Sequence, residues 1–223
     1  MKPGSPAGPV AFRSGPPRRR RVDGARRDEI LQRVQDLVLA EGFARLTVDD
    51  LAARLQCSKS TLYAVSSSKE YLVTKALRHF FRDATSSIEA QVAEVADPAQ
   101  RIAIYLAGVG SQMRRMSSGC YEDMVTHDST RDIYAINSAA AARRVRELIR
   151  EGVEVGRFGP VHAEFIGEAV GLLIDGIQHG ELLRTTGLSS GDAFTELSNL
   201  VLAALTNKSL RTRSAAPMRA AST

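Results

Sequence analysis

A cluster of hydrogen-bonding side chains between Ser58 and Tyr63 is the part of this sequence best equipped for recognition chemistry. Ser58 can cap a short helix, and Leu62 is the apolar residue that such a helix would bury. The side chains left on its outer surface are Lys59, Ser60, Thr61 and Tyr63. Groups of these kinds bind base edges and phosphates in DNA. A helical corner in an all-α protein would show the same pattern, so the neighbouring elements must decide between the two interpretations.

A second short helix is predicted immediately before this one. Thr47 is suited to cap it, and Asp49 and Asp50 fall in its first turn, where the helix dipole favours negative charge. Its buried side would consist of apolar residues at helical spacing: Leu51, Ala52 and Leu55. Only residues 56–57 separate the two helices, so the chain must turn sharply between them. This spacing predicts a helix-turn-helix, whose second helix is the recognition helix.

Longer helices flank the predicted helix-turn-helix. Upstream, apolar residues recur at helical spacing from Ile30 to Val38, and Gly42 follows where a C-cap glycine belongs. Downstream, Ser68 can cap a long helix whose apolar positions begin at Leu72. The order is a supporting helix, a short helix, the recognition helix and a long connecting helix. This order favours DNA binding over a helical corner.

Residues 28–72 resemble the DNA-binding domain of the TetR (tetracycline-repressor) family of transcriptional regulators. The motifs that carry the resemblance are Glu41-Gly42-Phe43, Leu46-Thr47-Val48, Leu51-Ala52, Ser58-Lys59-Ser60-Thr61-Leu62-Tyr63 and Ser68-Lys69-Glu70-Tyr71-Leu72. The resemblance implies a repressor that binds a palindromic operator in double-stranded DNA as a homodimer and is released by a small apolar effector. The DNA-contacting residues that it implies are Thr47, Ser58, Lys59, Ser60, Thr61, Tyr63 and Lys69.

The helix-turn-helix departs from the family pattern at several positions. The family usually has a small apolar residue in place of Leu55, glycine in place of Gln56, and glycine or proline in place of Ser60. Where this chain has Val65-Ser66, the family has an aromatic residue or histidine followed by a large apolar residue. Val65 cannot hydrogen-bond a phosphate, and Ser66 removes an apolar plug from beneath the recognition helix. An alternative hypothesis is therefore a helical interaction protein with a weakened DNA reader.

Composition and charge predict four segments in an all-α protein. The 223 residues are 43% hydrophobic, which allows a sizeable core, and they lack the alternating β-branched segments of a sheet. Residues 1–27 hold eight Lys or Arg against one acidic residue, so we expect a disordered basic arm that either contacts DNA phosphates or acts as a solubilising tail. The helix-turn-helix domain would span 28–72, a helical ligand-binding and dimerisation domain 73–207, and a disordered basic tail 208–223.

The last part of the chain carries two helices with broad apolar surfaces. From Phe165 to Ile177 almost every side of the predicted helix is apolar, so it must be covered on several sides. Burial in a monomer core would account for this, but a short chain has little material to cover both helices. We therefore expect a homodimer through a four-helix bundle, as the resemblance also implies. The predicted interface residues are Phe165, Val170, Leu173, Ile177, Leu197, Leu200 and Val201.

An effector site is predicted between the long connecting helix and the helices Ile102–Met113 and Ile133–Val155. Thioethers and phenols can line an apolar pocket and supply a few polar anchors. The candidates of these types are Tyr105, Met113, Met116 and Tyr134. Ordinary core packing is the other interpretation of the same residues.

Catalysis and cofactor binding have little support in this sequence. The four histidines are scattered without metal-ligand spacing, and neither a phosphate-binding glycine loop nor a nucleophile elbow occurs, so we expect no enzyme activity, metal or cofactor. Cys57 and Cys120 are expected to be free thiols, and a redox sensor based on Cys120, placed in a polar loop, is a second alternative. With neither a secretory signal nor an apolar run of membrane-spanning length, a cytoplasmic protein is expected.

Overall fold

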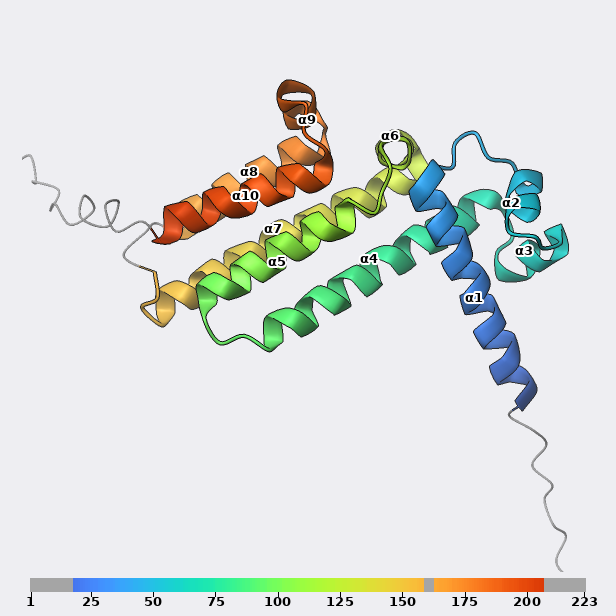
Figure 1. The fold of residues 1–223 in the computed structure, drawn as a ribbon, viewed down its shortest axis with the longest axis horizontal. Helices are drawn as coiled ribbons and strands as arrows, with labels where there is room; N and C mark the ends of the chain where they lie inside the picture. Colours follow the sequence, from blue (N-terminus) through green and yellow to red (C-terminus); the bar gives the residue numbers. More distant parts are fainter. Residues whose placement is uncertain (1–17, 159–162, 207–223) are drawn as a thin grey trace, which may run out of the picture.

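The computed structural model describes residues 18–158 and 163–206, which form ten helices and no strand (Figure 1). The N-terminal end comprises α1 (Arg18–Glu41), α2 (Val48–Arg54) and α3 (Lys59–Val65), and α4 (Lys69–Ala93) connects it to the bundle. The bundle continues through α5 (Pro98–Met113), α6 (Ser118–Thr126), α7 (Asp128–Glu154), α8 (Ala163–Gln178), α9 (Glu181–Thr186) and α10 (Ser190–Thr206). The predicted all-α class, with a three-helix N-terminal unit and a helical bundle, is confirmed.

Helix caps place the N-terminal elements where the sequence predicts them. Thr47 caps α2 in a capping box with Asp50, Ser58 caps α3, and Ser68 caps α4, each through its side-chain oxygen. Gly42 ends α1 with a φ of +80°, the left-handed conformation that glycine adopts most easily. The boundaries of the helix-turn-helix therefore follow from local chemistry.

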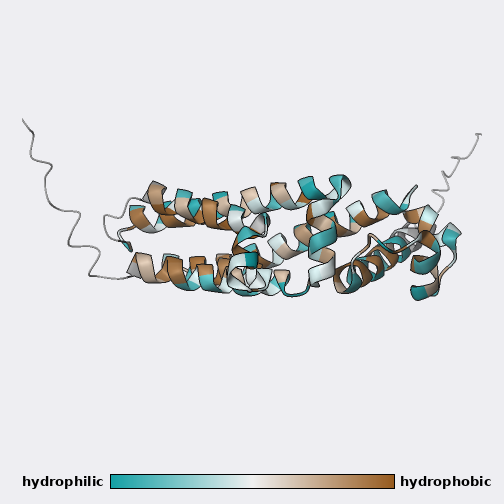
Figure 2. Ribbon diagram, turned by 90° about the horizontal axis from the view of Figure 1, so that it is seen from above, coloured by the Kyte–Doolittle hydropathy of each residue, from teal (hydrophilic) through white to brown (hydrophobic). Residues whose placement is uncertain are grey.

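The bundle is elongated because its long helices run side by side (Figure 1). α10 packs along α5, α8 packs along α7, and α8 and α10 contact each other. Apolar and polar residues alternate along these helices (Figure 2), and the apolar ones join a core that extends from Ile30 in α1 to Leu205 in α10. None of the helices in the described part of the chain is both long enough and apolar enough to cross a membrane.

The described part of the predicted basic arm is helical and not disordered. Residues 1–17 and the predicted tail, 208–223, lie outside the described residues. Residues 18–27 were expected to be disordered, but they form the first turns of α1. The physical reason is that every proline of the arm precedes Arg18, whereas arginine is a good helix former.

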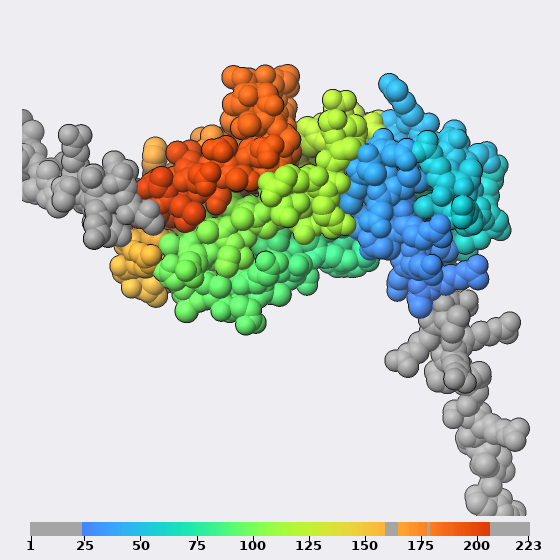
Figure 3. All heavy atoms as spheres, viewed as in Figure 1, coloured from blue at the N-terminus to red at the C-terminus, as the bar shows by residue number. Residues whose placement is uncertain are grey.

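Two further helices were not predicted from the sequence. The polar stretch after Ser117 forms α6, because Ser117 caps it and the apolar sides of Cys120 and Met124 are buried. The short α9 stands between Gly180 and Gly187, which both have positive φ. It buries none of its own residues and projects from the body of the molecule (Figure 3).

Candidate DNA interface and ligand cavity

The predicted recognition helix is α3, which exposes its polar face. The Ser58 hydroxyl accepts a hydrogen bond from the Thr61 backbone N–H at 3.1 Å and lies 2.7 Å from the Ser60 hydroxyl and 2.8 Å from that of Thr61. Tyr63 is 50% exposed, whereas Leu62 is buried beneath the helix. The hydroxyls at the start of α3 are thus tied to one another, and Tyr63 presents the largest exposed side chain.

An acidic residue of α2 holds the lysine of this face. The Lys59 ammonium lies 2.6 Å from the Asp49 carboxylate, and this hydrogen bond raises the pKa of Lys59 above its ordinary value. Both side chains are exposed, so the pair contributes little to stability. A base or phosphate that binds Lys59 would share the ammonium, which has three donors, with Asp49 or displace it.

The two predicted phosphate ligands outside α3 also have partners. The Thr47 backbone N–H and hydroxyl both donate to the Asp50 carboxylate, at 2.8 and 2.7 Å, and these bonds lower the pKa of Asp50. The Lys69 ammonium donates to the Ala44 carbonyl at 3.2 Å. Both residues lie at helix N-termini, where backbone N–H groups favour anions.

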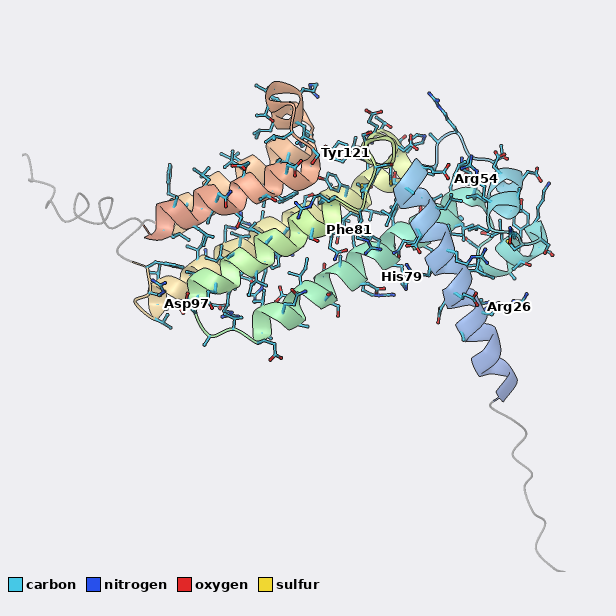
Figure 4. All side chains as sticks on the ribbon, viewed as in Figure 1. Arg26, Arg54, His79, Phe81, Asp97 and Tyr121 are labelled. Carbon is cyan, nitrogen blue, oxygen red and sulfur yellow. The ribbon has the colours of Figure 1, made fainter. Side chains whose placement is uncertain are left out.

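The helical, basic start of α1 lies beside α3. The sequence prediction had assigned this segment to a disordered arm. A groove between α1 and α3 is lined by Arg26, Arg27, Ser60, Thr61 and Val65 among others. Figure 4 shows Arg26 on the part of α1 that extends away from the bundle. The arginines therefore flank the recognition helix, and the absence of proline between Pro17 and the end of α1, with many arginines, was the signal that could have placed them there.

The family departures at the end of α3 have visible structural effects. The Ser66 hydroxyl is buried without a hydrogen-bond partner, which is costly for a polar group. The Val65 carbonyl accepts a hydrogen bond from the Lys75 ammonium at 2.8 Å, and the Val65 side chain is half-buried. The end of α3 is thus held by α4, with a polar atom in an apolar position.

A clasp joins α6 to the end of α1. The Asp123 carboxylate accepts hydrogen bonds from the backbone N–H groups of Phe43, at 2.6 Å, and Ala44, at 2.8 Å. The Ser117 N–H donates to the Leu39 carbonyl at 2.8 Å. A Cβ atom at Gly42 would lie 2.6 Å from the Asp123 carboxylate, so a larger residue here would have to displace that carboxylate. These contacts connect the helix-turn-helix unit to the bundle, and no local sequence pattern indicates them.

A cavity of about 260 Å³ lies between α4, α5, α7 and α10. Three of the four predicted effector residues line it: Tyr105, Met113 and Tyr134. Met116 instead lines a second hollow of about 510 Å³ among α5, α6, α9 and α10, which Met113 also touches. Burial, followed by the nearby Glu89 carboxylate, raises the pKa of Tyr105 to about 12, so its phenol is neutral at physiological pH.

Charged residues missed by the sequence prediction line one end of this cavity. The Arg144 guanidinium donates two hydrogen bonds to Glu89, at 2.9 and 3.2 Å, and one each to Glu147 and Glu151, at 3.3 and 3.2 Å. The bond to Glu89 is the main cause of the raised pKa of Arg144. Because Glu89 belongs to α4 and Arg144 to α7, this pair fastens the connecting helix to the bundle.

The seven predicted interface residues separate into two groups. Phe165 and Leu200 are 71% and 57% exposed, and Leu173 is half-buried. The others pack inside the protomer: Val170, Ile177, Leu197 and Val201. Leu172, which was not among the predicted residues, is 73% exposed on α8. The apolar surface left on α8 and α10 is therefore centred on Phe165, Leu172 and Leu200.

The two cysteines lack the features of a redox sensor. Cys120 is fully buried in α6, and this burial raises the pKa of its thiol to about 12. The prediction that Cys120 lies in a polar loop was wrong, since it lies in α6. A reactive cysteine needs an accessible thiolate, which this buried thiol does not provide. Cys57 is a half-buried free thiol. Among the described residues, no three metal-ligating side chains are grouped so as to hold a metal ion.

Solved structures share this fold at low sequence identity. A TetR transcription regulator from Haloarcula marismortui has a TM-score of 0.64 at 17% identity, over 82% of this chain and 98% of that chain. A transcriptional regulator from Saccharomonospora viridis in complex with choline has a TM-score of 0.63 at 20% identity, over 80% and 96% of the two chains. A TetR-family regulator from Cytophaga hutchinsonii gives 0.62 at 18% identity, over 84% and 98%. No family model and no curated protein matches the chain in sequence.

Proposed function

We propose that this chain, which has the fold of the TetR-family transcriptional regulators, is a homodimeric repressor that binds a palindromic operator and is released by a small, mainly apolar effector. The observation that carries the proposal is the exposed polar face of α3, capped by Ser58 and held on α2 and α4. A helix presented in this way fits the major groove. The protein then acts by binding and not by catalysis.

The proposed DNA contacts combine base reading with phosphate binding. Two copies would place their α3 helices in successive major grooves, with Lys59, Ser60 and Tyr63 toward bases. Thr61 would reach a base or a phosphate. The N-termini of three helices would bind phosphates through Thr47, Ser58 and Lys69. Selecting bound sequences from a random DNA pool would test this proposal, and recovery of no palindromic site would contradict it.

Tyr63→Ala tests the assignment of the recognition helix. The substitution should weaken operator binding by about 1–3 kcal/mol and leave non-specific binding almost unchanged, because it removes a side chain directed at bases. Fluorescence anisotropy with operator and scrambled duplexes measures both affinities. Tyr71→Ala is the matched control, since Tyr71 is also exposed, at 64%, but belongs to α4. Equal effects of the two substitutions on operator affinity would contradict the assignment.

The double substitution of Arg26 and Arg27 to alanine tests the basic flank of α3. If both guanidinium groups bind phosphates, affinity should fall for operator and scrambled DNA alike, and the slope of log K against log salt should decrease by about 1.8. The measurement is a salt titration of both duplexes. Arg82→Ala, which removes an exposed cation of α4, is the control. An unchanged slope in the double variant would show that these arginines do not contact DNA.

A second candidate function is favoured by one observation. The buried, unpartnered Ser66 hydroxyl lies under the recognition helix, which agrees with a helical interaction protein whose DNA reader has weakened. Ser66→Ala separates the two functions, because it should stabilise α3 on the domain. A gain in operator affinity would indicate a working reader, whereas the absence of any sequence-selective binding in both forms would favour the interaction protein.

A further inference from the structure

Four aromatic rings line the cavity between α4, α5, α7 and α10. They are Phe81, Tyr105, Tyr134 and Phe194. Phe81, labelled on α4 in Figure 4, lies with its ring centroid 6.3 Å from that of Tyr134. The faces of aromatic rings carry partial negative charge, so a group of rings attracts organic cations as well as apolar groups. The rings alone do not determine whether the ligand is charged. The charged residues at one end of the cavity do.

The Glu89 carboxylate is the charged group that acts most strongly on Tyr105. The effects on the pKa of its phenol, from the largest charge downward, come from Glu89, Arg144, Glu147 and Arg143. Among these charged groups the Glu89 carboxylate acts most strongly on the phenol. A ligand group placed beside this hydroxyl gains most if it is positively charged.

The pairing of the charged residues also favours a cation. A ligand cation that takes Glu89 leaves Arg144 with Glu147 and Glu151, so every charge keeps a partner. A ligand anion that takes Arg144 from Glu89 would leave a partly buried carboxylate without its two hydrogen bonds. Unpaired charges in such places are costly. A ligand cation can thus replace Arg144 at Glu89 without leaving any charge unpaired, whereas a ligand anion that replaces Glu89 at Arg144 leaves Glu89 unpaired.

We infer that the cavity binds an organic cation with an apolar body, whose charged end lies between the Tyr105 ring and the Glu89 carboxylate. This inference rests on the proposed function, since it names the chemical class of the effector. The apolar body lies along Ile88, Val109 and Met113. Because Glu89 fastens α4 to Arg144 of α7, the cation replaces a contact that holds the connecting helix, and binding is thereby coupled to the DNA-binding end.

Three probes of one shape test the charge of the ligand: phenyltrimethylammonium, neutral tert-butylbenzene and anionic 2-methyl-2-phenylpropanoate. Calorimetric titration of the full chain should give the cation an affinity at least about tenfold above the other two. Glu89→Gln should remove most of this advantage and leave tert-butylbenzene binding unchanged. Glu94→Gln is the control, because it removes the same charge from the end of α4, away from the cavity.

Tyr105 provides a test that does not depend on the Glu89–Arg144 pair. Tyr105→Phe keeps the ring and should retain the preference for the cation, whereas Tyr105→Leu should lose it by about tenfold. Equal binding of all three probes, tightest binding of the anion, or failure of the cation to bind at millimolar concentration would overturn the inference.

Operator binding by the same preparations keeps this result separate from the proposed function. Release of operator by tert-butylbenzene as readily as by the cation would overturn only the cation inference. Binding of the cation by a chain that recognises no operator would uphold the ligand class and reject the repressor.

Discussion

Leu172→Asp should split the proposed dimer and leave the protomer folded. Leu172 is 73% exposed, so a carboxylate there is solvated in a single copy but would be buried without a partner against a second copy. Such burial costs several kcal/mol. Because a monomer engages only one half of a palindrome, operator affinity should fall by about 100-fold or more. Sedimentation equilibrium at micromolar concentration measures the mass, and anisotropy measures the affinity.

Ile136→Asp is the matched control for this experiment. Ile136 is an exposed aliphatic residue of comparable size on α7, outside the apolar surface of α8 and α10. It should change neither mass nor operator affinity, and circular dichroism should show the same helix content for both variants. A wild-type protein that sediments as a monomer would reject the dimer, and an unchanged dimer in Leu172→Asp would place the interface elsewhere.

Gly42→Ala should lower the free energy of unfolding by about 3–5 kcal/mol. The left-handed conformation at φ +80° costs an alanine about 1–2 kcal/mol. The new Cβ would also collide with Asp123 and displace a carboxylate that accepts two backbone hydrogen bonds, and the loss of one of these bonds costs about 1.5–3 kcal/mol. Thermal unfolding followed by circular dichroism measures the loss, which corresponds to a fall of roughly 10 °C in Tm.

Gly156→Ala separates backbone strain from this collision. Gly156 has a φ of +70°, but a Cβ atom there would meet nothing within 4 Å. It should therefore lose only the conformational contribution of about 1–2 kcal/mol. If both variants lose the same stability, the clasp between α6 and α1 contributes nothing measurable.

The N-terminal half of the fold could be predicted because its signals are local. Thr47, Ser58 and Ser68 cap the helices that they were expected to cap, and each cap is formed by residues three positions apart. Three of the residues predicted to line an effector site, Tyr105, Met113 and Tyr134, do line one cavity, and whether that cavity binds an effector stays a prediction. Resemblance to a family supplied that placement, because apolar spacing alone cannot distinguish a cavity from a packed core.

The contacts that join the elements could not be predicted, because they connect residues far apart in sequence. Glu89 and Arg144 are separated by 55 positions, and Asp123 binds the Phe43 N–H across 80. A single sequence shows these residues only as surface charges on separate helices. The sequence also could not separate the exposed from the buried residues of the predicted interface. Periodicity marks Val170 and Leu172 as apolar without showing which one packs inside its own protomer.

Between Lys69 and Glu89, α4 is one uninterrupted helix, about 30 Å long at a rise of roughly 1.5 Å per residue. If such a rod turns by about 6° around Glu89, its Lys69 end sweeps roughly 3 Å, close to the spacing of about 3.4 Å between base pairs. In a two-fold symmetric pair both ends sweep together, so the span between the recognition helices changes by about twice that distance. The stiffness of a single helix is thus enough to turn a few degrees of tilt at the cavity into a misfit of one to two base pairs on DNA.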